Sequence, residues 1–187
     1  MNQQNIADHD QQLKKHLIRG KILNIEVFNI NTDYYVFNND AFWLFDGGIH
    51  IQLEHGGFGW GWNYDETLFA YSMQKHIKEF LSPNYVQVKN DTFPGISVLL
   101  ESAIQDVEIK WEYYQDINEE FEAIGEKIYF PLEVILHFEN GPHLQLAVIA
   151  FEMPNDSFEM SNPTYSIDGE LHINFNDVIP IKNVNAD

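Results

Sequence analysis

The chain has no cysteine among its 187 residues, which excludes disulfide bonds and thiolate chemistry. Its longest purely apolar run, residues 146–151, has six residues, whereas a membrane-spanning helix needs about 20. The first ten residues are polar and acidic, so we expect no secretory signal peptide. These absences favour a cytoplasmic protein that does not enter a membrane.

Positive charge is scarce as well. Ten Lys and Arg residues face 29 Asp and Glu residues, and the formal net charge is −19. Arg19 is the single arginine, and four of the ten cations lie within residues 14–21. Such a surface repels nucleic acid and anionic lipid and attracts basic proteins at enhanced rates. We therefore expect no nucleic-acid ligand. The charge either keeps the protein soluble or serves to recruit a basic partner.

Apolar residues are plentiful, at 44% of the chain with 14% aromatic, which is ample material for a packed core. The length suits a single domain, residues 1–187. Several stretches alternate between apolar and polar residues, and a few have helical spacing. We predict an α+β fold: a strongly twisted antiparallel sheet built from meander and hairpin units, with two or three helices packed on it.

Helical spacing marks three segments. In residues 8–19, Asp8 can act as the N-cap and Gly20 as the stop. Residues 65–81 place an apolar stripe on one helical face. Apolar residues 96–104 fit a third helix, although their β-branched side chains suit a buried strand equally well.

Three nine-residue segments share one pattern, in which an apolar residue, an acid and turn residues precede His, an aliphatic residue and an amide. Asp-Gly and Asn-Gly pairs favour two-residue hairpin turns. We predict turns within residues 46–48, 140–141 and 168–169, and the three histidines on the strands that follow. The segments are FDGGIHIQL at 45–53 with His50, FENGPHLQL at 138–146 with His143, and IDGELHINF at 167–175 with His172.

The first two of these segments also share their surroundings. Each follows an alternating strand (residues 21–28 and 107–113), a polar connection and a second apolar strand. In the first alternating strand, Leu23, Ile25 and Val27 should face the core together. The likeness indicates two related β-meander halves, about 20–90 and 105–182. Chance similarity between amphipathic hairpins is the alternative.

Residues 55–62, HGGFGWGW, are rich in glycine. They lack the Gly-Lys-Ser/Thr ending of a phosphate loop, and the chain has no Gly-x-Ser-x-Gly nucleophile elbow. As a strand, the segment puts Phe58, Trp60 and Trp62 on one face and glycines on the other. We expect the aromatic face in the core and the glycine face approached closely by another backbone or a large side chain. An aromatic platform for a ligand is the alternative.

The three hairpin histidines would share one polar face if their strands were neighbours, and with Glu54 they would make a metal site. Zinc sites, however, usually take two ligands from one short segment, and the chain has no His-x-His or His-Glu-x-x-His. We therefore predict no metal and no cofactor.

Acidic residues concentrate in residues 101–126, which hold nine acids against Lys110 alone. Val107, Ile109, Trp111 and Tyr113 should face the core, and the charged residues between them should face solvent. The loop that follows adds further acids beside Tyr114 and Phe121, which we expect to be exposed. The segment is a solvated face, an anionic docking surface, or an acid/base pair or cation site. The candidate partner-binding residues are Glu108, Glu112, Asp116, Glu119 and Glu120.

Four features give the chain a family resemblance: LIRGKILNIEVF at 17–28, FDGGIHIQL at 45–53, GFGWGWN at 57–63 and the acid excess. Together they resemble immunity proteins of bacterial toxin–immunity systems, which are small, acidic, cysteine-poor, single-domain proteins. The resemblance implies a non-enzymatic protein that covers the active site or substrate groove of one cognate toxin, and the acid excess favours a basic one. Two other classes remain: a ligand-binding module that uses the Trp60/Trp62 strand, and a hydrolase whose His and carboxylate residues assemble only in the fold.

Overall fold

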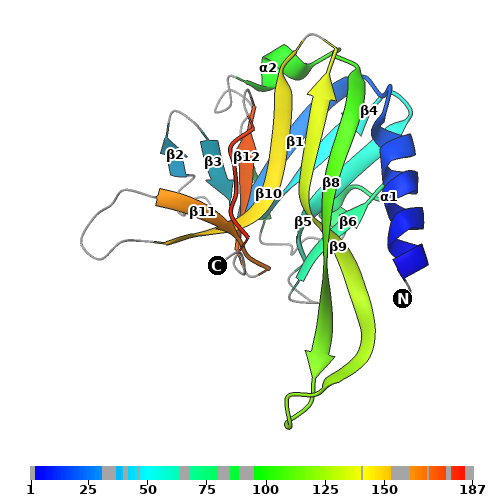
Figure 1. The fold of residues 1–187 in the computed structure, drawn as a ribbon. Coiled ribbons are helices and arrows are strands. Elements are labelled where there is room, and N and C mark those ends of the chain that lie inside the picture. The colour runs from blue at the N-terminus through cyan, green and yellow to red at the C-terminus, as the bar shows by residue number, and fades with distance from the viewer. Residues whose placement is uncertain are drawn as a thin grey trace.

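The computed structural model shows two stacked antiparallel sheets (Figure 1). It describes residues 3–30, 37–39, 42–45, 47–63, 68–79, 85–88, 95–139, 141–152, 161–167, 169–175 and 178–183. Within them, two α-helices are present, and one has only four residues. The predicted α+β fold is therefore wrong, because strands dominate and pack on one another. No helix in the described ranges is long and apolar enough to span a bilayer.

The smaller sheet has five strands in the order β6-β5-β4-β1-β7. Its strands are β1 (Ile22–Ile30), β4 (Gly47–Leu53), β5 (Gly56–Asn63), β6 (Leu68–Ser72) and β7 (Tyr85–Val88). The strand predicted at 21–28 is thus present, but the β1–β4 ladder shifts register between Ile22 and Asn24. This irregularity buries Ile22 and leaves Leu23 45% exposed, so Leu23 does not face the core as predicted.

The larger sheet has seven strands in the order β2-β3-β12-β10-β9-β8, with β11 also paired to β10. Strand β8 therefore lies at one edge of this sheet. The two longest described strands, β8 and β9, are neighbours here. The strands are β2 (Phe37–Asn39), β3 (Phe42–Phe45), β8 (Ile104–Ile117), β9 (Ala123–Phe138), β10 (His143–Glu152), β11 (Ser161–Tyr165) and β12 (Glu170–Asn174).

The core lies between the two sheets. Strand alternation turns one face of each sheet inward, and the inward side chains form a single apolar cluster. Residues from both sheets in this cluster are fully buried. Ile25, Ile51, Phe58 and Trp60 come from the smaller sheet, and Val134, Leu136, Leu146 and Ile173 come from the larger one.

Helix α1 (Gln3–Leu17) closes the side of the sandwich between the edge strands β6 and β8 (Figure 1). Its Leu13 and Leu17 are fully buried. His9 Nδ1 lies 2.8 Å from the Tyr71 hydroxyl of β6, and Trp111 Nε1 of β8 donates to Asp10 Oδ1 at 3.1 Å. The helix begins before the predicted residues 8–19, so Asp8 lies inside it and does not cap it.

The helix predicted at 65–81 does not form in the described part of that segment. Residues 68–72 are strand β6, which is followed by the short 3₁₀ turn η1 (Ile77–Glu79). Phe69 lies opposite Trp62 on β5, with ring centroids 5.3 Å apart. Cross-strand aromatic pairing and burial have overridden the helical spacing. The third predicted helix shrinks to α2 (Ile96–Leu99), and Ile104 begins β8.

One of the three predicted hairpins is confirmed. β9 and β10 pair directly across the turn that contains Gly141, which has a φ of +95°. The first prediction is wrong, because β3 and β4 belong to different sheets. The third is also wrong, because β11 and β12 both run antiparallel to β10 and the chain does not reverse between them. All three histidines do lie on strands, as predicted.

Candidate functional site

The glycine face of β5 is occupied as the sequence predicts. Phe58 and Trp60 point into the core and are fully buried, so the aromatic face is not an open ligand platform. On the opposite face, a Cβ atom at Gly57 would lie 2.8 Å from His50 Cε1, and one at Gly59 would lie 3.2 Å from Ile77 Cβ. The glycines therefore make room for His50 and for the segment that follows β6.

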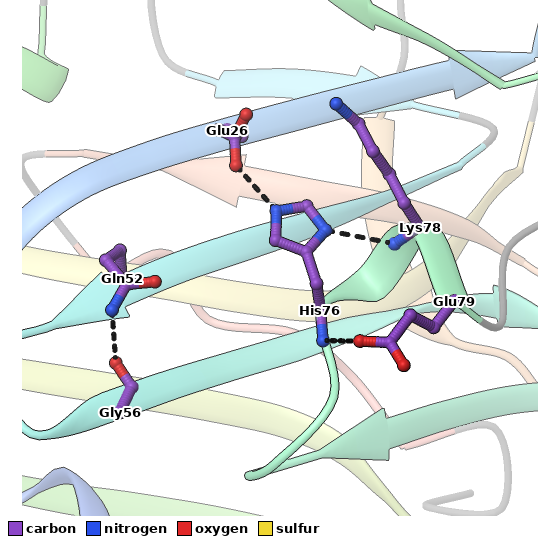
Figure 2. Close-up of polar contacts among 6 residues, drawn as sticks. All are labelled: Glu26, Gln52, Gly56, His76, Lys78 and Glu79. Carbon is purple, nitrogen blue, oxygen red and sulfur yellow. Dashed lines mark hydrogen bonds and ion pairs between the residues drawn. The ribbon is translucent and has the colours of Figure 1, made fainter.

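His50 and His76 form a small cluster on this outer face, and Figure 2 shows His76 with its contacts to Glu26 and Lys78. His76 Nε2 lies 2.8 Å from Glu26 Oε2, and the backbone N–H of Lys78 donates to His76 Nδ1 at 3.2 Å. Because Nδ1 accepts a hydrogen bond, we assign the proton to Nε2, which donates to the carboxylate. The His50 ring stacks on His76 with centroids 3.9 Å apart.

The contacts of His76 and Ser72 hold chain segments together. Burial, and then the neighbouring His76, lower the pKa of His50. Both ring nitrogens of His76 are already engaged. Ser72 on β6 accepts the backbone N–H groups of Gln74 and Lys75, so its hydroxyl caps a turn. The Glu26–His76 contact thus fastens the segment after β6 over β1 and β4.

The three hairpin histidines do not come together. His50 lies on the five-stranded sheet, whereas His143 and His172 lie on the larger one. His143 Nδ1 is 2.9 Å from His137 Nδ1, and His137 Nε2 is 2.8 Å from Glu108 Oε1. His172 lies opposite Ala147 and Leu44, and burial lowers its pKa to about 3. Among the residues that the structure describes, no group of three or more His, Asp or Glu side chains is placed to hold a metal ion.

The predicted acidic surface lies mainly on a long hairpin that projects from the sandwich (Figure 1). We define the arm as residues 112–130, the outer parts of β8 and β9 with their turn, closed at its base by the Glu112–Phe130 pair. At its end, Asn118 Oδ1 accepts the backbone N–H groups of Glu120 and Glu122 at 3.1 and 2.8 Å. The side chain of Asn118 thereby holds the turn in one conformation.

Four of the five predicted contact residues lie on this arm, and Glu108 lies further back on β8. The Glu108 carboxylate faces His137, as described above. Asp116 accepts a hydrogen bond from the Tyr114 hydroxyl at 2.9 Å, and Glu119 and Glu120 are exposed in the turn. The structure therefore places a ribbon of carboxylates along one projecting element.

The predicted facing of the aromatic residues of β8 is wrong at its outer part. Tyr113 is exposed, and Lys127 Nζ lies 3.7 Å from its ring centroid. Tyr114, for which we expected exposure, is half-buried against the core cluster. The β8–β9 ladder shifts register between Lys110 and Trp111 and again after Tyr114, and such irregularities redirect side chains. Phe121 is exposed as predicted.

The sequence did not indicate that the arm also exposes three aliphatic side chains. Ile117 is 59% exposed and Ile124 is 47% exposed, on either side of the turn that carries Phe121, and Ile128 further along β9 is 46% exposed. The length of β8 and β9 could have indicated this exposure. With 14 and 16 residues, these strands extend past the strands of the other sheet, so their outer side chains are left uncovered. Exposed apolar residues clustered on one element are typical of interaction sites.

Comparison of the chain with protein-family models, curated proteins and solved structures gave no match. The functional argument therefore depends on the geometry of the arm and on the charge around it.

Trp60 and His50 point to opposite faces of their sheet. Trp60 of β5 lies opposite Ile49 of β4, and His50 of β4 lies opposite Gly59 of β5, so the two side chains belong to adjacent pairs that alternate between faces. A single pocket cannot use both side chains.

Proposed function

We propose that the protein is a non-enzymatic, immunity-type protein that binds and neutralises a basic bacterial toxin through its arm. The observation that carries this proposal is the charge of the projecting element. Residues 111–126 contain six acids and no Lys or Arg. The acids are Glu112, Asp116, Glu119, Glu120, Glu122 and Glu126.

Charge held on a projecting, ordered hairpin acts differently from charge spread over a sphere. Like-charged carboxylates on one element produce a local field that steers a cationic partner toward that element. Such a field acts over about one Debye length, roughly 8 Å at physiological salt. A toxin that acts on nucleic acid would present a cationic groove, which complements an acidic arm in charge.

Several features support binding over catalysis. The histidine–carboxylate contacts that the structure describes fasten strands and a turn. The acids of the arm are exposed or half-exposed, whereas catalytic carboxyl groups usually need a partly desolvated environment that shifts their pKa. The resemblance to immunity proteins agrees with the same conclusion.

The proposal is tested by co-expression with the product of the gene next to that of this chain, which the proposal expects to be a basic toxin. We expect that protein alone to arrest growth and the wild-type chain to restore it. The E112K/E119K variant should restore growth poorly, because it reverses two charges on the arm. The E54K/E139K variant carries the same net charge change on exposed residues outside the arm and should protect like wild type. Absence of protection by the wild-type chain would contradict the proposed function.

A further inference from the structure

The end of the arm exposes apolar side chains on both of its faces. Ile124 lies opposite Asp116 in the β8–β9 ladder, and Ile117 lies opposite Ala123. Directly opposed side chains share a face, and adjacent pairs alternate between faces. Ile117 and Ile124 therefore point to opposite sides of the hairpin. Phe121 lies in the turn between them and is 84% exposed.

This arrangement does not suit a surface that lies flat on another. A flat contact would cover one face of the hairpin and leave the isoleucine on the other face in water. Apolar side chains on both faces and at the turn are buried together only if the partner surrounds the end of the arm. The acids Asp116, Glu119, Glu120 and Glu122 are interspersed with these apolar residues. The surrounding surface must therefore offer both cations and apolar groups.

A second copy of the chain does not meet this requirement. Each copy carries a formal charge of −19, and mutual insertion of two arms would bring their carboxylates together. The negative charge of the arm therefore favours a positively charged partner protein.

Building on the proposed function, we propose that the end of the arm is an apolar anchor that inserts into a cleft of the basic partner. The cleft is lined by Lys or Arg side chains interleaved with apolar ones. The carboxylates guide the arm to the cleft and meet its cations. The side chains of Ile117, Phe121 and Ile124 then fill its apolar interior, and their burial slows dissociation.

The test uses two synthetic peptides with equal numbers of lysines, one interleaved with leucine and the other with glycine. Binding of each to the full-length protein is measured by titration calorimetry and by NMR shifts of the arm amides. We expect the lysine–leucine peptide to bind about tenfold more tightly or better, since burial of one large apolar side chain supplies at least that factor. The shifts should be centred on residues 116–124.

Two variants locate the source of this preference. The triple variant I117S/F121S/I124S should bind both peptides equally, with the affinity that wild type shows for the lysine–glycine peptide. The control L23S/V86S/V98S removes three other exposed apolar side chains and should keep the wild-type preference. Both variants should melt close to wild type, because exposed side chains contribute little to the core.

Three results would overturn the anchor: equal binding of both peptides to wild type, a leucine preference that persists in I117S/F121S/I124S, or a wild-type dimer that this variant dissociates. The last would identify a second copy as the occupant. Failure of the anchor leaves the co-expression result untouched, because that experiment depends on the charged residues. Failure of protection with an intact leucine preference would instead contradict the proposed function.

Discussion

Trp60 carries the largest fully buried side chain in the described part of the chain. Its ring packs against Phe69 with centroids 6.2 Å apart, and its neighbours across the sheet are Ile49 and Tyr71. We expect Trp60→Ala to lower the free energy of unfolding by about 3–5 kcal/mol, because it removes the transfer free energy of the indole and leaves a cavity. A denaturant melt of the variant measures this loss.

A second substitution at the same position separates volume from polarity. The buried Nε1 atom of Trp60 has no hydrogen-bond partner among the residues that the structure describes. Trp60→Phe should therefore destabilise much less than Trp60→Ala, since it removes an unpaired donor and keeps most of the ring. An unchanged midpoint for Trp60→Ala would show that the indole is exposed and would restore the ligand-platform hypothesis.

His172 makes the stability depend on pH. Burial lowers its pKa from 6.5 to about 3, so the unfolded chain takes up the proton first as the pH falls. The free energy of unfolding should therefore be level above about pH 6.5 and should decrease below it. From this one group the decrease reaches about 2 kcal/mol at pH 5. The lowered pKa of His50 acts in the same direction.

Urea melts between pH 5 and 8 measure this dependence. Between pH 8 and pH 5, the free energy of unfolding of His172→Gln should decrease by about 2 kcal/mol less than that of wild type. A His172→Gln curve parallel to wild type would mean that the imidazole is protonated in the folded protein.

At the scale of elements, Asn118 determines the order of the arm. Its side-chain oxygen accepts two backbone N–H groups, from Glu120 and Glu122. Asn118→Ala should cost the turn about 1 kcal/mol and speed amide hydrogen exchange at residues 120 and 122 about fivefold. Exchange in β9 and β10 should not change. Asn118→Asp keeps the acceptor oxygen but loses the contact from Nδ2 to Glu122 Oε2, so its exchange should lie between those of wild type and the alanine variant. An alanine variant whose amides exchange as slowly as those of wild type would contradict the role of this side chain.

Elements with strong local patterns were predicted from the sequence, but the strands and sheets with which they pair were not. The alternation of residues 107–113 and the turn at Gly141 correctly gave strands β8 and β10 and the β9–β10 hairpin. The segment FDGGIHIQL carries an equally strong turn signal, yet the chain passes there from one sheet to the other. Local sequence does not encode which sheet a strand joins, because that choice depends on long-range packing.

The candidate site was predicted in part for the same reason. Glu112, Asp116, Glu119 and Glu120 could be read from charge alone, and they do lie on one exposed element. Their projection beyond the sandwich follows from the lengths of β8 and β9, whereas the sequence led us to expect a strand over residues 107–113 followed by a loop. The exposure of Ile117 and Ile124 could not be predicted, because isoleucine in an alternating strand normally indicates a core position.

At the scale of the whole molecule, the protein combines a packed sandwich with a projecting acidic hairpin (Figure 1). Helix α1 carries Lys14 and Lys15, and the arm carries no Lys or Arg over residues 111–126. The arm, residues 112–130, thus carries six acids and Lys127, a net charge of −5, whereas the two acids and two lysines of α1 cancel. This separation of charge is the basis for the central claim that the arm is where a basic partner first makes contact.

The association rate of the purified protein with the product of the neighbouring gene, which this account expects to be basic, tests this claim most directly. It is measured by stopped-flow fluorescence over a range of salt concentrations, with E112K/E119K and the charge-matched E54K/E139K. We predict association about tenfold slower for E112K/E119K at low salt, a difference that shrinks as salt rises, and a much smaller change for E54K/E139K. Equal rates and equal salt dependence for the two variants would show that net charge alone matters and that the arm is only a solvated surface.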